Sequence, residues 1–212
     1  MMPGRLQNTE LVVPVVVGTV AIHLGKKATE YASHRWTVYV RGLGNEDISH
    51  VVHRVTFNLH TSFQVPVRHV EAPPFEVTET GWGEFEIGVV LHFPPDSGEK
   101  DVELFHRLKL YGEDDPTGTK QKPVVHEQVE ELVFVCPAQG FYQRVVSHVP
   151  RPRAPLSVEE YLAPPSEGEE LATVQAARRK VAQLSAGLRL QLQAPAADSP
   201  SAAGAHMMMH HM

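Results

Sequence analysis

The chain has 212 residues, one cysteine and a formal net charge of −6 at pH 7. This length is enough to bury one good core and to leave an appendage, so we expect one domain and a tail. The lone Cys136 excludes an intramolecular disulfide framework and indicates a reducing compartment. The negative charge argues against a protein that bulk electrostatics holds on DNA or on an anionic membrane. Sequence-specific DNA binding is therefore not expected, and a basic partner fits better.

The amino-terminal segment predicts neither a secretory signal nor a membrane span. Residues 11–17 have no basic lead, and Pro14 interrupts them. The run is also shorter than the roughly 20 apolar residues that a membrane-crossing helix needs. We therefore expect no membrane partner, and a location in the cytosol or the nucleus.

Residues 11–149 are predicted to form one all-β domain. Strands are expected at residues 11–24, 36–40, 51–59, 67–70, 75–78, 84–93 and 102–111, and as one strand or two at 124–135. No helix is long enough for a crossover between parallel strands, so the pattern favours an antiparallel β-sandwich. Alternation places Trp36, Val38 and Val40 inward, which assigns Trp36 to the core. Cys136, which follows an apolar run, is expected to be a small buried hydrophobe.

The composition changes after residue 149. Residues 150–165 contain five prolines and are predicted to be a linker. A helix is predicted over 166–193, because Ser166 and Glu169 have capping-box spacing. Its apolar stripe contains Leu171, Val174, Ala177, Val181, Leu184 and Leu188. This stripe predicts a coiled coil with another helix, or packing against the sandwich as the alternative. Residues 194–212 are of low complexity and are predicted to be a disordered tail.

No catalytic or metal-binding motif is found in the sequence. The thirteen histidines do not form a His-Glu-x-x-His motif, and the chain has no cysteine pair and no calcium loop. There is also no nucleophile elbow and no phosphate-binding glycine loop. We therefore expect no metal, no cofactor and no enzymatic activity.

Two predicted loops bring aromatic residues to one end of the sandwich. Trp82 lies between Gly81 and Gly83, and glycine on both sides favours a loop tip where the backbone approaches a neighbour closely. The strand that ends at residue 59 leads into a second loop, which contains His60, Ser62 and Phe63. Residues 84–87 alternate as a half-buried strand, so Trp82 is expected at the mouth of a sheet.

The segments 59–63 and 73–87, which contain these two loops, resemble the YEATS family of chromatin readers. Further matching segments are residues 25–27, 36–42, 45–47 and 108–110, and the resemblance extends from about residue 11 to residue 141. It is greatest for the subfamily shared between histone acetyltransferase and histone-exchange complexes. The resemblance implies an immunoglobulin-like sandwich, a nuclear location and a carboxy-terminal coiled coil that serves assembly with other subunits of chromatin complexes.

The resemblance also implies a binding site for acylated lysine. Acylation leaves an uncharged flat amide on an apolar stem, and such a group needs a flat slot with hydrogen-bonding partners. Phe63 and Trp82 would clamp the amide, and Ser62, held by His60, would hydrogen-bond it. The backbone N–H of Trp82 would donate to the acyl oxygen. The matching family positions also include Gly81, Gly83 and Phe85, which shape the pocket. The sequence departs from the family at Ala32, where some members place an aromatic residue or histidine, and Tyr31 and His34 lie nearby.

The expected partners are acylated tails of histone three, with either acetyl or crotonyl groups on the lysine. Two alternatives stay open. In the first, Phe63 closes the core, Trp82 covers it, and Ser62 is a simple turn residue. In the second, the chain is an immunoglobulin-like scaffold of a nuclear complex that binds strand edges and has no selectivity for modified lysine.

Overall fold

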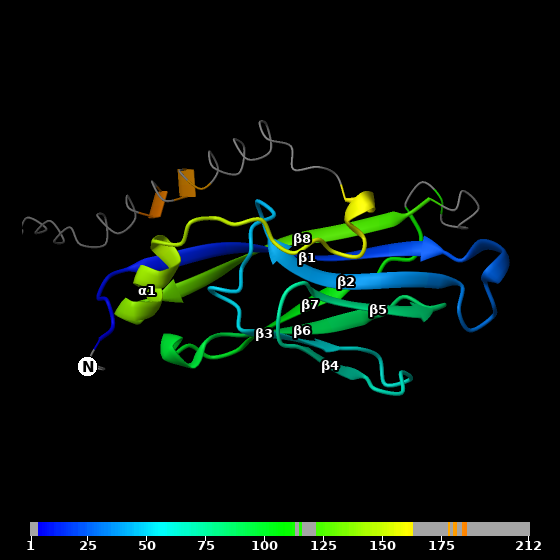
Figure 1. The fold of residues 1–212 in the computed structure, drawn as a ribbon, viewed down its shortest axis with the longest axis horizontal. Coiled ribbons are helices and arrows are strands. Elements are labelled where there is room, and N and C mark those ends of the chain that lie inside the picture. The colour runs from blue at the N-terminus through cyan, green and yellow to red at the C-terminus, as the bar shows by residue number, and fades with distance from the viewer. Residues whose placement is uncertain are drawn as a thin grey trace, which may run out of the picture. The chain divides into compact units, whose positions relative to one another are not determined.

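The computed structural model describes residues 4–112, 115, 122–162, 178, 180, 181, 184 and 185 (Figure 1). Its main element is a pair of four-stranded antiparallel sheets, with strand orders β5-β2-β1-β8 and β4-β3-β6-β7. The strands are β1 Glu10–His23, β2 His34–Gly42, β3 Arg54–Asn58, β4 Val67–Val70, β5 Phe75–Gly81, β6 Glu86–His92, β7 Val102–Arg107 and β8 Val124–Val135. The predicted all-β, immunoglobulin-like sandwich is confirmed.

The core lies between the two sheets and is formed by alternate residues of each strand. Val15 and Val17 of β1 and Trp36, Val38 and Val40 of β2 are all buried there. Trp36 is only 1% exposed, which confirms its assignment to the core. Side chains of successive strand residues point to opposite faces, so one alternating set is enough to fill the space between the sheets.

The prediction for residues 124–135 left one strand or two open, and the structure has one long strand. β8 pairs with β1 continuously from Val124 to Val135. Pro14 lies on the part of β1 that pairs with β8 alone, since pairing with β2 begins at Val15. This position suits proline, which has no backbone N–H, because no hydrogen bond to β2 is required there.

One helix was missed from the sequence. α1, Gln139–Val146, follows β8 and buries Phe141 in the core, where its ring lies 5.0 Å from that of Phe134. An eight-residue helix is too short to be stable alone. The packing of Phe141 in the core stabilises it, and the local pattern of apolar residues does not show this contact. Within residues 4–162, where the structure describes them, the other helical segments are the 3-10 turns η1 Gly25–Lys27, η2 Pro95–Ser97 and η3 Glu159–Tyr161.

Cys136 differs from its expected environment. It is only partly buried and its φ is 51°, at the point where β8 ends and the chain turns toward α1. Its backbone N–H donates to the carbonyl oxygen of Thr9, and its own carbonyl oxygen accepts from Arg5. The hydrogen bonds of this turn, and not burial of the thiol, therefore determine where Cys136 lies.

The proline-rich segment after residue 149 is packed on the sandwich where the structure describes it. It runs along the outer face of the first sheet in Figure 1. Leu156 and Val158 are buried there against Val20 and Tyr39, in a small second core. The hydroxyl and backbone N–H of Ser157 both donate to the Glu76 carboxylate. Residues 150–162, which are part of the predicted linker, therefore form a strap on the sheet.

The predicted helix over 166–193 and the tail over 194–212 lie outside the described residues, except for five positions. Residues 178, 180, 181, 184 and 185 are helical. Val181 and Leu184, which belong to the predicted apolar stripe, are exposed. Among the residues that the structure describes, no helix has the length and apolar character needed to cross a bilayer.

Candidate binding site

A cavity of about 600 Å³ lies where the loop after β3, the end of β5 and the turn before β6 meet. Its lining contains every residue that the sequence predicted for the site, namely His60, Ser62, Phe63, Gly81, Trp82, Gly83 and Phe85. Residues that are about 20 positions apart in the chain are thus brought around one space by the pairing of the strands. A volume of this size is typical of small-ligand and side-chain pockets.

The loop after β3 is closed by its own hydrogen bonds. The backbone N–H of Leu59 donates to the carbonyl oxygen of Pro66 at 2.8 Å, and that of Phe63 donates to the carbonyl oxygen of His60 at 3.1 Å. His60 Nδ1 accepts the backbone N–H of Ser62 at 3.2 Å and lies 2.9 Å from Ser62 Oγ. A ring nitrogen that accepts an N–H carries no proton, so the Ser62 hydroxyl donates its hydrogen to this nitrogen. The lone pairs of Ser62 Oγ remain available to accept a hydrogen bond.

Phe63 and Phe85 form a wall that rests on the core. The ring of Trp36 lies 5.8 Å from Phe63 and 5.7 Å from Phe85, and both pairs are edge-to-face. Phe63 and Phe85 are 5.8 Å apart, and the His60 ring lies 6.0 Å from Phe85. Edge-to-face contacts are favourable because the positive edge of one ring meets the negative face of the other. Phe63 therefore packs on the core, as the alternative interpretation expected, and lines the cavity as well.

Trp82 stands away from the core. Its side chain is 62% exposed, and none of the ring contacts described in the structure involves it. No hydrogen bond among the described residues uses its backbone N–H. Its indole and this N–H are therefore both available at the cavity, which does not fit the alternative that Trp82 serves to cover the core.

The turn that carries Trp82 is held at both ends. On one side, the backbone N–H of Ser33 donates to the Gly81 carbonyl oxygen at 3.1 Å. On the other, Leu108 donates to the Phe85 carbonyl oxygen at 2.9 Å, and the Leu110 N–H donates to Glu84 Oε1 at 2.8 Å. These bonds hold the main chain of the turn in place and leave its tip free.

The two glycines of the turn have different environments. A Cβ on Gly81 would lie 3.4 Å from Trp36 Nε1, so this glycine allows the turn to approach the buried indole closely. A Cβ on Gly83 would meet nothing within 4 Å. The space beside Gly83, a lining residue of the cavity, is therefore open.

The third wall of the cavity is Tyr31, which the sequence had left undecided. Ala32 occupies the position where the resemblance expected an aromatic residue, and Tyr31 lines the cavity instead with a side chain that is 75% exposed. The turn between Thr29 and Ala32, closed by backbone hydrogen bonds in both directions, fixes this arrangement. Further lining residues that the sequence analysis did not name are Gln64, Glu79, Thr80 and Glu84.

Two acidic residues lie among the lining of the cavity. Glu79 and Glu84 line it, and no lysine or arginine is among its described lining residues. Arg68 forms an ion pair with Glu79 from the neighbouring strand β4, and Glu84 is held by the backbone N–H of Leu110. Glu79 is therefore already neutralised by a basic side chain, and Glu84 is the second carboxylate of the lining.

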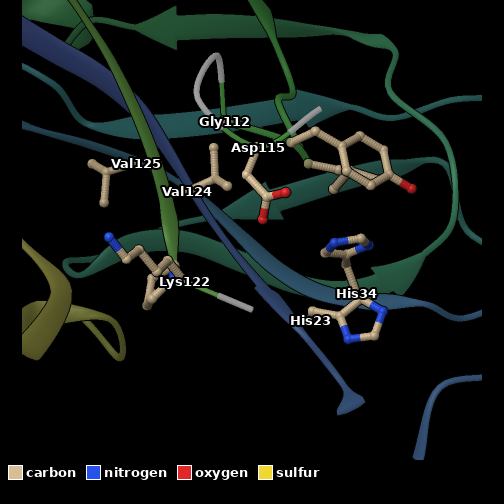
Figure 2. A pocket seen from close by; sticks show the side chains of 10 residues that line it. His23, His34, Gly112, Asp115, Lys122, Val124 and Val125 are labelled. Atoms are coloured by element: carbon tan, nitrogen blue, oxygen red, sulfur yellow. The ribbon is translucent and has the colours of Figure 1, made fainter. Parts of the chain in front are cut away.

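A second, smaller cavity of about 220 Å³ contains none of the predicted site residues (Figure 2). His23 and His34 lie at one end with their ring centroids 4.9 Å apart, and Lys122 lies at the other. Burial lowers the pKa of His34 below its ordinary value, His23 adds to this effect, and Glu84 opposes it. His34 is therefore held neutral near pH 7. Among the described residues, no three His, Cys, Asp or Glu side chains are arranged to hold a metal ion.

The fold and the larger cavity define an immunoglobulin-like β-sandwich whose loops form an aromatic-walled pocket. The model of the YEATS family matches residues 31–112, which include all of the predicted site residues. The Arabidopsis thaliana protein "Transcription initiation factor TFIID subunit 14b" is 45% identical over 215 aligned residues, covering 89% of this chain and 80% of that protein. The Saccharomyces cerevisiae "Protein AF-9 homolog" is 35% identical, covering 68% of this chain and 71% of the relative.

Solved structures agree with these sequence matches. The crystal structure of the Yaf9 YEATS domain bound to H3K27ac superposes with a TM-score of 0.60 at 36% identity, covering 68% of this chain and 99% of that one. The Yaf9 YEATS domain recognizing an H3K122suc peptide has a TM-score of 0.58, again at 36% identity, with coverages of 68% and 98%. The chain belongs to the YEATS family.

Proposed function

We propose that this protein reads acylated lysine on histone tails through the larger cavity. The observation that carries the proposal is the position of two hydrogen-bonding groups beside the aromatic walls: the lone pairs of Ser62 Oγ, oriented by His60, and the unused N–H of Trp82. A secondary amide presents one N–H donor and one carbonyl acceptor, which these two groups complement.

The recognition follows from the shape and polarity of this slot. The acylated side chain enters between Phe63 and Trp82, and its amide plane stacks on their rings. The lysine amide N–H donates to Ser62 Oγ, and the acyl carbonyl oxygen accepts from the Trp82 backbone N–H. An unmodified lysine offers a hydrated ammonium with three donors and no acceptor, so it leaves the Trp82 N–H without a partner.

The partner is a histone tail, and the tail of histone H3 in particular. Support comes from the absence of lysine and arginine among the described lining residues, which avoids repulsion of a basic peptide, and from the Yaf9 YEATS domain in complex with H3K27ac. We expect the cavity to take acyl groups longer than acetyl as well, such as crotonyl. A histone reader acts in the nucleus, which is where we place the protein.

Assembly into chromatin complexes is assigned to the carboxy-terminal helix predicted over 166–193. The relatives named as a TFIID subunit and as AF-9 homologs support a role as a subunit of transcription complexes. Histone acetyltransferase and histone-exchange complexes are the assemblies that we propose. Replacing Leu184 and Leu188 by Asp introduces two charges into the apolar stripe. This double change should abolish co-purification of partner subunits and leave peptide binding intact. If co-purification is unaltered, the helix does not serve assembly.

The test of the reading function is calorimetric titration of the full chain with three versions of one histone H3 peptide, unmodified, acetylated and crotonylated. We expect binding of both acylated peptides and little of the unmodified one. Ser62→Ala should weaken the acylated peptides selectively, because the amide N–H then has no acceptor. Equal affinity for all three peptides would favour the alternative of a scaffold without modified-lysine selectivity.

A further inference from the structure

The strap of residues 150–162 places one serine on the surface between two buried apolar side chains. Ser157 is exposed, whereas Leu156 and Val158 on either side of it are each only 4% exposed. The backbone N–H of Ser157 donates to Glu76 Oε2 at 3.0 Å and to Oε1 at 3.2 Å, and its hydroxyl donates to Oε2 at 3.2 Å. Glu76 belongs to β5, so one carboxylate joins the middle of the strap to the first sheet.

The residues that follow Ser157 suit a protein kinase that prefers acidic substrates. Glu159 and Glu160 are the second and third residues after the serine, and both are exposed. Kinases select substrates partly by the charges that flank the acceptor residue, and a basic substrate cleft binds carboxylates at such positions. Ser157 therefore combines an exposed position with the flanking charges that an acid-directed kinase selects.

A phosphoryl group on Ser157 is incompatible with the present contact to Glu76. The esterified Oγ has no hydrogen left to donate, although this atom lies 3.2 Å from Glu76 Oε2. The phosphoryl group also adds a charge of about −1.5 to −2, and a phosphate beside a glutamate repels it. Glu76 is half-buried, so water and salt screen this repulsion less than at a fully exposed site.

We propose that Ser157 is the phosphorylation site of an acid-directed protein kinase, and that its modification releases the strap from the first sheet. Ser157 Oγ attacks the γ-phosphorus of ATP while the bond from this phosphorus to the departing ADP breaks. The hydroxyl proton passes to the carboxylate base of the kinase. The serine reaches the kinase when the strap opens locally, and the phosphate then prevents its return. Release uncovers Val20 and Tyr39, on which the strap packs.

The opposite effect would require a cation that holds the phosphate on the strap. Arg153 is already engaged there, because its Nη2 lies 2.7 Å from Glu159 Oε2 and donates to Asn45 Oδ1 at 3.4 Å. A phosphate that captured Arg153 would tighten the strap, so tightening is the result that opposes the proposal. No described residue of the strap lines the larger cavity, so this site is distinct from the proposed reading site.

The first measurement is mass spectrometry of the full chain after incubation with a purified acid-directed serine/threonine kinase and Mg-ATP. Ser166 also precedes glutamates, at positions 167 and 169, so every sample carries Ser166→Ala. We expect one phosphoryl group on Ser157, and its loss when Ser157→Ala is added. If the kinase leaves Ser157 unmodified, the assignment of the site is wrong.

The second measurement is hydrogen exchange before and after phosphorylation. The Asp47 N–H donates to the Arg151 carbonyl oxygen, and the Ser157 N–H donates to Glu76, so both amides report on attachment of the strap. We expect phosphorylation to speed exchange of these two amides at least about tenfold through local opening. Exchange in β6 should not change, which shows that the sandwich stays folded. Unchanged or slower exchange of the two amides would overturn the proposed release.

Glu76→Gln tests whether repulsion causes the release. The glutamine side chain keeps an oxygen that accepts from Ser157 and removes the negative charge. Each chain is compared with its own unmodified form, so any change in the resting strap cancels. Phosphorylation should speed exchange of the strap less in Glu76→Gln than in the chain with Glu76. Equal acceleration in both chains would contradict the proposal.

Discussion

Replacing Trp82 by Ala separates a reader of acylated lysine from a scaffold. If the indole stacks on the acyl amide, its removal takes away one wall of the slot. Aromatic stacking contributes about 0.5–1.5 kcal/mol beyond the buried area, and each Å² of apolar surface covered contributes about 25 cal/mol more. The affinity for acetylated peptide should fall by at least about tenfold, which corresponds to about 1.4 kcal/mol.

The structure indicates that this loss will not come from unfolding. The Trp82 side chain is 62% exposed and makes none of the described ring contacts that join Phe63 and Phe85 to Trp36. Surface substitutions of this kind change the free energy of unfolding by about 0.5 kcal/mol or less. The melting temperature of Trp82→Ala should therefore stay close to that of the wild type.

The assay is calorimetric titration of wild type, Trp82→Ala and the control Phe105→Ala with acetylated, crotonylated and unmodified peptides. Phe105 is a similarly exposed aromatic residue, 58% exposed, on β7 and outside the cavity. We expect crotonyl binding to fall more than acetyl binding in Trp82→Ala, because the longer planar group has more π surface to lose. If Trp82→Ala binds acetylated and unmodified peptides in the wild-type ratio, the aromatic slot does not read the modification.

Three further predictions concern stability. Trp36→Ala should lower the free energy of unfolding by roughly 3–5 kcal/mol, because the indole is fully buried; a melting temperature near wild type would show that it is not a core residue. Gly18→Ala should destabilise by about 1–3 kcal/mol, because its Cβ would lie 2.5 Å from the buried Tyr39 ring. The control Gly140→Ala meets nothing within 4 Å and should not destabilise. Burial lowers the pKa of His106 from 6.5 to about 4. As the pH falls, the unfolded chain therefore protonates this histidine before the folded chain does. The contribution of His106 to the free energy of unfolding should be complete above pH 6.5 and should fall between pH 6.5 and 4, by up to about 1.4 kcal/mol per pH unit. Denaturant titrations across this pH range measure it. If His106→Asn shows the same dependence of the free energy of unfolding on pH as the wild type, the reasoning is wrong.

Those parts of the fold that depend on local sequence were predictable. Alternation of apolar residues identified the strands and placed Trp36 in the core, because side chains on neighbouring positions of a strand point to opposite faces. Glycine on both sides of Trp82 indicated an exposed tip, and the structure places the residue there. The segments around His60 and Trp82 also carried the family resemblance. Each of these features depends on a few consecutive residues, so it can be predicted without knowing the tertiary neighbours of those residues.

The tertiary structure decided which distant segments meet. Tyr31 became the third wall because the β1–β2 connection lies beside the end of β5, a neighbour that no local pattern specifies. Leu156 and Val158 pack on Tyr39, so a proline-rich stretch became a strap because an apolar patch on the outer face of the sheet was available to it. β8 became an edge through the order of the strands. Burial and pairing are properties of long-range contacts, and they therefore appear only when the chain is folded.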